Sequence, residues 1–266
     1  MSDSHDPADT NEEVWRWALT NTHHGRLSQL PSTSRCTVCR TPFAGLSGLL
    51  AYIVRRHPSK LNPHICNYCE DVLPLGGAEI DVAILFADVR GSTELAESMS
   101  GRAYSEVLTR FYKIASKALI KRGAIIDKLI GDEVMAFFVP AIDIERNGLG
   151  YRFRSVRAAV EMLHEVGYRP DGEPWLPLAV GVHAGDAWVG KLGTDGVHTF
   201  TTVGDTVNVA ARLRSEAEAG EILIGDDLYD TVEPDYPWLS EREVSVKGKS
   251  QPLRVHSLRP EALSPV

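Results

Sequence analysis

A stretch of nine residues limits the possible folds more than any other part of the sequence. Residues 81–89, DVAILFADV, form a nearly continuous apolar run, which is typical of a strand buried on both faces of a sheet. Helical spacing of apolar residues follows over residues 102–122 and again over residues 151–166. Strands that alternate with helices in this way predict an α/β or α+β sheet covered by helices.

The residues that follow continue the same pattern of strands and helices. Residues 127–138, DKLIGDEVMAFF, predict a two-stranded hairpin, because the Gly131-Asp132 pair suits a tight turn between apolar segments. Residues 205–220 predict a helix that ends with Gly220 as its C′ residue. The remaining extended segments are a strand pair at 176–185 and 187–193, a short strand at 198–204, and strands at 221–225, 242–248 and 253–258.

Length and charge narrow the class of protein. The 266 residues allow one good-sized domain and an accessory module, and the composition, 43% hydrophobic and 24% charged, is that of a soluble globular chain. A net charge of −8 gives no basis for binding nucleic acid. The longest uncharged run that could suggest a membrane span, residues 41–54, is shorter than the ~20 apolar residues that cross a bilayer. Because the N-terminus is acidic and polar, it is not a secretory signal peptide, and we expect a cytoplasmic protein.

The cysteines form two C-x2-C pairs, Cys36 with Cys39 and Cys66 with Cys69. The cytosol keeps thiols reduced, so the pairs indicate a metal site rather than disulfides. Structural Zn2+ in a tetrahedral site is the preferred interpretation, and a redox-responsive Fe–S cluster is the main alternative. The expected organisation is an acidic, polar tail to about residue 13 and a short helix within 1–30, a CxxC…CxxC metal-binding module at 31–75, and a larger domain at 78–260.

Two carboxylates are expected where predicted strands end. Asp88 ends the apolar strand and precedes Gly91-Ser92-Thr93, a good helix N-terminus whose free N–H groups favour phosphate. Asp132 lies at the end of an apolar strand as well, within the predicted hairpin turn. Each aspartate alone could be ordinary turn chemistry. If their strands are neighbours, however, the two carboxylates converge into a hard-oxygen site for Mg2+ or Mn2+, as in two-metal phosphoryl transfer.

A polar pair lies on the helix that begins near residue 205. Asn208 and Arg212 are four residues apart and therefore share one face. An arginine suits negative charge that develops on a phosphoryl group, but taken alone this helix is better explained by a solvent-exposed polar stripe. The later segment SVKGKS lacks the first glycine of a P-loop, because Glu243 occupies that place.

Together these segments resemble the catalytic domain of the class III nucleotidyl cyclases, over about residues 78–259. FADVRGST is similar to the family's first metal-carboxylate motif, DKLIGDEVMAFF to the second, and TFTTVGDTVNVAARL to the transition-state helix. VKGK follows in the family's order. The resemblance implies an α+β fold, with a ferredoxin-like β-α-β-β-α-β core, additional strands and helices, and the small Cys-rich module before it.

The resemblance also implies an activity, adenylyl cyclase, with two Mg2+ or Mn2+ ions per active site. Asp88 and Asp132 would bind both ions, with the Val89 carbonyl as a further ligand. Asn208 would orient the ribose, and Arg212 would stabilise the pentavalent transition state. Phosphate contacts would come from Lys247 and from the loop of Gly91, Ser92 and Thr93.

Two positions read the base in this family, and they correspond here to Lys128 and Thr201. A lysine can donate to adenine N1 and a threonine hydroxyl can accept from the N6 amino group, so the pair favours ATP. Thr201 departs from the aspartate of the mammalian enzymes, which weakens the argument for strict selectivity.

The family's active sites lie across a head-to-tail dimer, so the resemblance implies a homodimer with two shared sites. Asp88 and Asp132 would come from one chain, and Lys128, Thr201 and the helix residues from the other. A guanylyl cyclase, a diguanylate cyclase related through IGDEV, and a catalytically silent nucleotide- or metal-sensing module are the alternatives.

Overall fold

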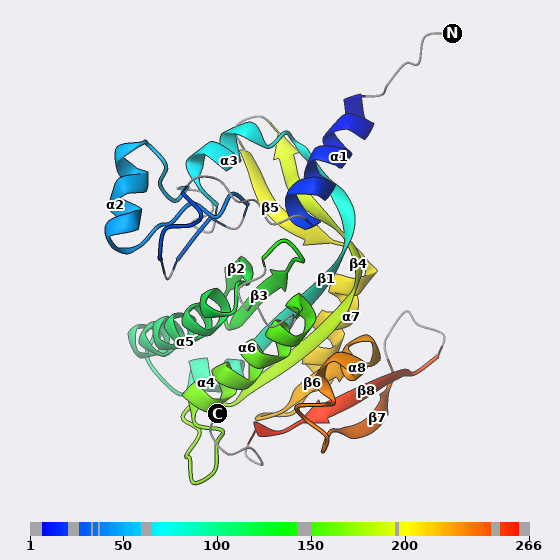
Figure 1. Ribbon diagram of the computed structural model, residues 1–266. Helices are drawn as coiled ribbons and strands as arrows, with labels where there is room; N and C mark the ends of the chain where they lie inside the picture. Colours follow the sequence, from blue (N-terminus) through cyan, green and yellow to red (C-terminus); the bar gives the residue numbers. More distant parts are fainter. Residues whose placement is uncertain are drawn as a thin grey trace. The chain divides into compact units, whose positions relative to one another are not determined.

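The computed structural model in Figure 1 describes most of the chain. The described residues are 7–20, 27–32, 34–36, 38–59, 65–142, 150–194, 197–245 and 251–260. They divide into two compact units, the first containing residues 1–82, 139–148 and 186–204, and the second residues 83–138, 149–185 and 205–266. None of the helices in these ranges is both long enough and apolar enough to cross a bilayer.

The second unit contains the predicted β-α-β-β-α-β core. Its strands form one sheet in the order β2-β3-β1-β4-β6-β8-β7. The part of the sheet formed by β4, β1, β3 and β2, in this order and with β2 at the edge, has the strand order of a ferredoxin-like fold. The elements are β1 (Gly76–Val89), α4 (Ser92–Glu97), α5 (Gly101–Lys121), β2 (Ile125–Ile130), β3 (Glu133–Phe138), α6 (Tyr151–Val166), β4 (Leu178–Thr194), α7 (Asp205–Glu216), β6 (Ile222–Gly225), η1 (Asp226–Leu228), α8 (Tyr229–Val232), β7 (Ser240–Val244) and β8 (Leu253–Leu258).

Helices α5 and α6 cover one face of this sheet and lie side by side in Figure 1. Their shared core includes Leu85, Phe138 and Val180, which belong to three different strands and are fully buried. Burial of such side chains stabilises the fold by roughly 1.5–3 kcal/mol each. On the solvent side, Lys121 of α5 forms an ion pair with Glu161 of α6 at 2.6 Å.

Helix α7 packs on the other face of the sheet. Alternate strand residues such as Ala179 and Leu223 point to this face and form a second core with Val209 and Leu213 of the helix. The helix approaches β4 so closely that a side chain at Gly181 would lie 2.2 Å from the backbone nitrogen of Arg214. The sheet is therefore covered on both faces, as the apolar run at 81–89 predicts.

The first unit is built from α1 (Pro7–Thr20), α2 (Gly45–Ile53), α3 (Asn67–Val72), β5 (Val197–Val203) and the parts of β1 and β4 that it includes. Strand β5 pairs with β4 in an antiparallel hairpin. Trp15 of α1 is fully buried; its ring stacks on Phe200 of β5 at 5.5 Å, and its Nε1 donates to the Pro74 carbonyl. These contacts attach the N-terminal helix to the hairpin.

Three sequence-based boundaries were wrong. The segments predicted as a pair of strands, at 176–185 and 187–193, are one continuous strand, β4, because Gly185 adopts a positive φ of 156° without ending it. Helix α7 ends at Glu216, so Gly220, with a φ of 79°, belongs to the following turn. Helix α1 begins at Pro7, inside the segment expected to be a polar tail, and proline suits the first turn of a helix.

Candidate active site and four-cysteine centre

The two predicted metal carboxylates lie at the same end of the sheet. Strand β3, rather than β2, pairs with β1, and the antiparallel register places Asp88 opposite Glu133. Asp132 is the residue immediately before Glu133, in the turn between β2 and β3, and its carbonyl accepts a hydrogen bond from the Val89 N–H at 3.3 Å. The structure therefore brings the two loops together through backbone contacts.

Asp88 is the most buried carboxylate of this group, with 12% of its side chain exposed. Burial raises its pKa to about 6, although Arg214 lowers it; the nearby Asp132 and Glu133 raise it further. Burial and the charge of Asp132 also raise the pKa of Tyr104 on α5. The end of the sheet thus has an excess of negative charge, which a divalent cation would offset.

Two arginines complete the site, and the sequence motifs did not identify either. Arg214 in the last turn of α7 forms ion pairs with Asp88, at 3.3 Å, and with Glu133. Arg90 lies within FADVRGST, two residues after Asp88; its Nε donates to the Ala217 carbonyl at 2.9 Å, just beyond the C-terminus of α7. Glu133 is 81 residues from Arg214, and Ala217 is 127 residues from Arg90. The sequence therefore showed only that the two arginines are basic and did not indicate their partners.

The phosphate-loop candidates follow at the start of α4. Gly91 is the N-cap residue and has a φ of 66°, a left-handed conformation that glycine adopts without strain. Ser92 and Thr93 form the first turn of this helix, which has only six residues. The turn that carries Asp132 is held from α5, since the Tyr112 hydroxyl donates to the Gly131 carbonyl at 2.6 Å.

Asn208 and Arg212 lie on α7 as predicted, and neither is fully buried. The buried side chains of α7 are instead those of Thr206, Val209, Ala210 and Leu213. Within the described residues, neither Asn208 nor Arg212 forms an ion pair or hydrogen bond with the carboxylates of this chain.

The base-reading candidates lie in different compact units. Lys128 is exposed on β2, next to a register irregularity between β2 and β3. Thr201 on β5 has only 2% of its surface exposed and pairs with Gly190 of β4. Lys247 lies outside the described residues.

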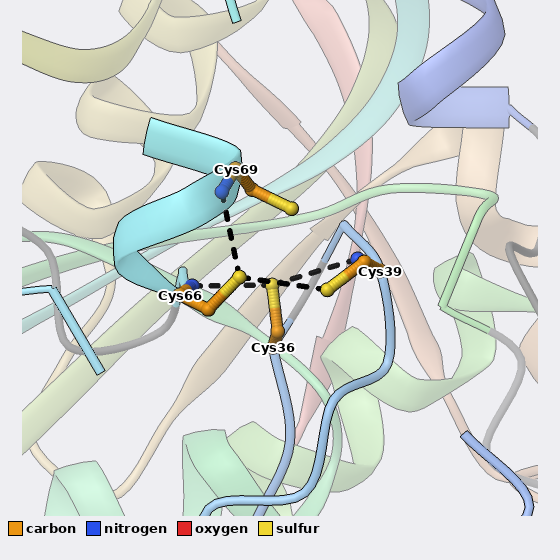
Figure 2. A group of neighbouring side chains, drawn as sticks. All are labelled: Cys36, Cys39, Cys66 and Cys69. Carbon is orange, nitrogen blue, oxygen red and sulfur yellow. Dashed lines mark hydrogen bonds between the residues drawn. The ribbon is translucent and has the colours of Figure 1, made fainter. Parts of the chain in front are cut away.

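The four cysteines converge within the first unit. Figure 2 shows Cys36, Cys39, Cys66 and Cys69 directed toward a common centre. Their sulfur atoms all lie within 4.8 Å of one another. A turn supplies Cys36 and Cys39, and the start of α3 supplies Cys66 and Cys69. Backbone N–H groups point at the sulfurs, with the Cys66 N 3.2 Å from Sγ of Cys36.

The chemistry of this cluster suits a thiolate-bound metal. Hydrogen bonds with Cys36 lower the pKa of Cys39 and of Cys66, whereas burial raises the pKa of Cys36 and a hydrogen bond with Cys36 raises that of Cys69. The Arg56 guanidinium lies 3.7 Å from the sulfur of Cys39, where it favours a thiolate. Metals bind thiolates rather than thiols, so a site that stabilises negative sulfur favours metal binding. With Zn–S bonds of ~2.3 Å, a tetrahedral ion would place its four sulfurs ~3.8 Å apart. The observed group is about this size, whereas a cluster of several irons and sulfides would hold the cysteines farther apart.

Helix α3 connects this centre to the β4–β5 hairpin in the same unit. Cys66 caps the helix, because its sulfur accepts a hydrogen bond from the Cys69 N–H. At the other end, Lys191 of β4 donates to the carbonyls of Glu70 and Leu73, at 2.5 and 2.9 Å. The lysine therefore stabilises the carbonyl end of the helix.

Comparison with known proteins identifies related chains over the larger part of the sequence. Residues 78–259 match the model of the family described as the adenylate and guanylate cyclase catalytic domain. An adenylate cyclase of Anabaena cylindrica is 26% identical over 186 residues, which make up 67% of this chain and 36% of that protein. The chain spans about a third of the length of the first curated relatives it matches.

Solved structures share the fold. The adenylyl cyclase CyaB from P. aeruginosa is 29% identical, with a TM-score of 0.55 over 69% of this chain and 95% of that one. The guanylyl cyclase Cya2 is 23% identical, with a TM-score of 0.58 over 69% of this chain and 93% of that one. Similar structures thus include enzymes named for either nucleotide.

Proposed function

The chain belongs to the adenylate and guanylate cyclase catalytic domain family, and on this basis we propose that it is an adenylyl cyclase that converts ATP to 3′,5′-cyclic AMP and pyrophosphate. The observation that carries the proposal is that the segments of Asp88 and Asp132 lie together at one end of the sheet, where the Asp88 carboxylate is largely buried. Carboxylate oxygens are the ligands that Mg2+ and Mn2+ prefer, and both side chains belong to loops tied together by the Val89–Asp132 hydrogen bond.

The residues of the site have separate roles in this reaction. Asp88, Asp132 and the Val89 carbonyl would hold two divalent ions. Bound there, such ions lower the pKa of the ribose 3′-hydroxyl and neutralise the triphosphate. The loop of Gly91, Ser92 and Thr93 binds phosphate through its N–H groups, and Lys247 provides a further cation for the terminal phosphates.

Helix α7 acts on the other half of the substrate. Asn208 hydrogen-bonds to the ribose and orients its 3′-hydroxyl, while Arg212 donates to the α-phosphate as negative charge develops there. Lys128 donates to adenine N1, and the Thr201 hydroxyl accepts from the N6 amino group. This base-reading pair is the reason to prefer ATP over GTP.

The sites are shared between two copies of the chain. Asn208 and Arg212 are not fully buried, and neither pairs with a carboxylate among the residues that the structure describes, which supports their use in a partner's site. A homodimer would then have two equivalent sites, since each chain carries both halves.

The four-cysteine centre is a structural Zn2+ site in this proposal. The spacing of the sulfurs supports a single tetrahedral ion over a multi-iron cluster. Metal analysis of the purified protein should give one zinc per chain and a colourless solution; stoichiometric iron with visible absorption would replace zinc by the iron alternative. Reduced cysteines and an ATP substrate both favour a cytoplasmic location.

The activity is tested by incubating the purified protein with ATP or GTP and Mg2+ or Mn2+, and separating the products by chromatography. Cyclic AMP as the main product is expected. Cyclic GMP or a cyclic dinucleotide would identify the other cyclase reactions, and the absence of any such product would favour a nucleotide-sensing module.

The shared site is tested by mixing two inactive variants, Asp132→Ala and Arg212→Ala. With random exchange of subunits, about a quarter of the sites would be intact, so about a quarter of the activity should return. The matched control mixes Asp132→Ala with Asp88→Ala, which remove residues from the same half-site and should give no recovery. Equal results for the two mixtures would contradict sharing.

A further inference from the structure

The Arg214 side chain touches two carboxylates at the candidate metal site. Its Nη1 lies 3.3 Å from Oδ2 of Asp88, and its Nη2 contacts Oε2 of Glu133. About a fifth of the Arg214 side chain is exposed, so the guanidinium is largely removed from water. Its buried Nε finds no acceptor among the described residues, and the two carboxylates alone therefore orient the group.

The position of Arg214 on α7 separates it from the residues proposed for the partner's site. Successive residues of an α-helix are rotated by about 100°, so Arg214 projects about 200° away from Arg212. Asn208 shares the face of Arg212 because the two are four residues apart. One helix thus presents Arg214 to the carboxylates of its own chain and a different face to its surroundings.

A purely structural role does not account for this arrangement. Arg90 already attaches the metal-carboxylate loop to the end of α7, through carbonyls of that helix and of Ala217. The Arg214 guanidinium instead contacts the carboxylate oxygens of Asp88 and Glu133, and Asp88 is a proposed metal ligand. A cation that binds Asp88 at ~2.0–2.1 Å and a guanidinium 3.3 Å from the same carboxylate repel each other strongly.

We propose that Arg214 is a positioning residue that acts as the built-in counter-ion of the metal site: its guanidinium neutralises Asp88 and Glu133 until a divalent cation displaces it from Asp88, after which it stays on Glu133. The inference rests on the proposed function through the assignment of Asp88 as a metal ligand. Arg214 therefore sets the cation concentration at which the site fills, and Glu133 provides the place to which the guanidinium withdraws.

The test measures the direct binding of Mn2+ to the full chain, with the proposed Zn2+ already bound at the cysteine centre. Free Mn2+ is quantified from its electron paramagnetic resonance signal. Arg214→Gln removes the competing charge and should bind Mn2+ about tenfold more tightly than the wild type. Glu133→Gln removes the alternative partner, so Arg214 stays on Asp88 and Mn2+ should bind about threefold or more weakly. Arg214→Lys keeps the positive charge and should stay within about threefold of the wild type.

Opposite shifts for the two neutral variants cannot result from a general loss of structure, and the thermal midpoint of each variant is measured alongside. Binding by Arg214→Gln that is unchanged or weaker than wild type overturns the proposal, as does tighter binding by Glu133→Gln. If Arg214→Gln does not fold, Arg214→Lys and Glu133→Gln decide the question. Mn2+ binding by Arg214→Lys that is about tenfold tighter than that of the wild type would refute the role of charge. Asp88→Asn should abolish this binding; if it binds Mn2+ as the wild type does, the metal assignment itself fails, and the proposal with it.

Discussion

The substitution Asp88→Asn should remove activity and yet stabilise the protein. The native state buries an ionised carboxylate whose pKa is raised from 3.8 to about 6, and this difference includes the opposing effect of Arg214. A shift of about two units corresponds to about 3 kcal/mol at 1.4 kcal/mol per unit. Because some solvent reaches the site, we expect a gain of about 1–3 kcal/mol in the free energy of unfolding at pH 7.5.

The sign of the effect fixes its pH dependence. A carboxyl group whose pKa is raised in the native state adds to the free energy of unfolding fully at pH values below its unfolded pKa. This stabilisation is lost as the pH rises through about 6. The advantage of Asn, which stays neutral, should therefore be largest above pH 6 and nearly absent by pH 4.

The assay is urea unfolding monitored by tryptophan fluorescence, for wild type and variant, at several pH values between 4 and 8 and without added divalent cations. Equal slopes against urea concentration would confirm that the two proteins unfold over the same surface. The reasoning is refuted if Asp88→Asn is less stable than wild type at pH 7.5, because the ion pair with Arg214 would then outweigh burial. An advantage that grows as the pH falls would refute it as well.

Substitutions at three positions of the first compact unit, each measured by thermal or urea unfolding, test its packing and hydrogen bonds. Trp15→Ala should cost about 3–5 kcal/mol, and Trp15→Phe, which keeps a ring but loses the indole donor, should cost clearly less; equal losses would mean that ring packing is unimportant. Lys191→Met should lower stability by about 1–3 kcal/mol by removing the charged donor to α3, and no change would argue against that contact. Gly190→Ala should cost about 1–3 kcal/mol or more, since its Cβ would lie 2.2 Å from the Gly76 carbonyl oxygen, whereas Gly101→Ala meets no atom within 4 Å and serves as the control.

The sequence predicted the elements of the fold well because each had a local signal. The apolar run at 81–89 is a strand covered on both faces, and the Gly131-Asp132 turn joins β2 to β3. The strand order places β1 beside β3, so the convergence of the two aspartate loops followed from pattern and resemblance together. The cysteine spacing likewise predicted the cluster in Figure 2.

What could not be predicted depends on contacts between distant segments. The Gly185-Asp186 pair has the composition of a turn, but pairing with neighbouring strands keeps β4 continuous through it. Arg214 and Glu133 are 81 residues apart, and no periodicity in either segment relates one side chain to the other. The predicted turn gave no reason to treat Glu133 as more than a turn residue until the register placed it opposite Asp88.

The contacts of Arg90 have a consequence for how mutational maps of this protein should be read. Its guanidinium joins the loop after Asp88 to the end of a helix that lies 124–127 residues farther along the chain. Replacing it would loosen the loop after Asp88 and the helix together, and turnover would fall without any contact between Arg90 and the substrate. A scan scored on activity alone would therefore count Arg90 among the substrate-contacting residues, and only a parallel measurement of folded, nucleotide-binding protein would separate the two kinds of defect.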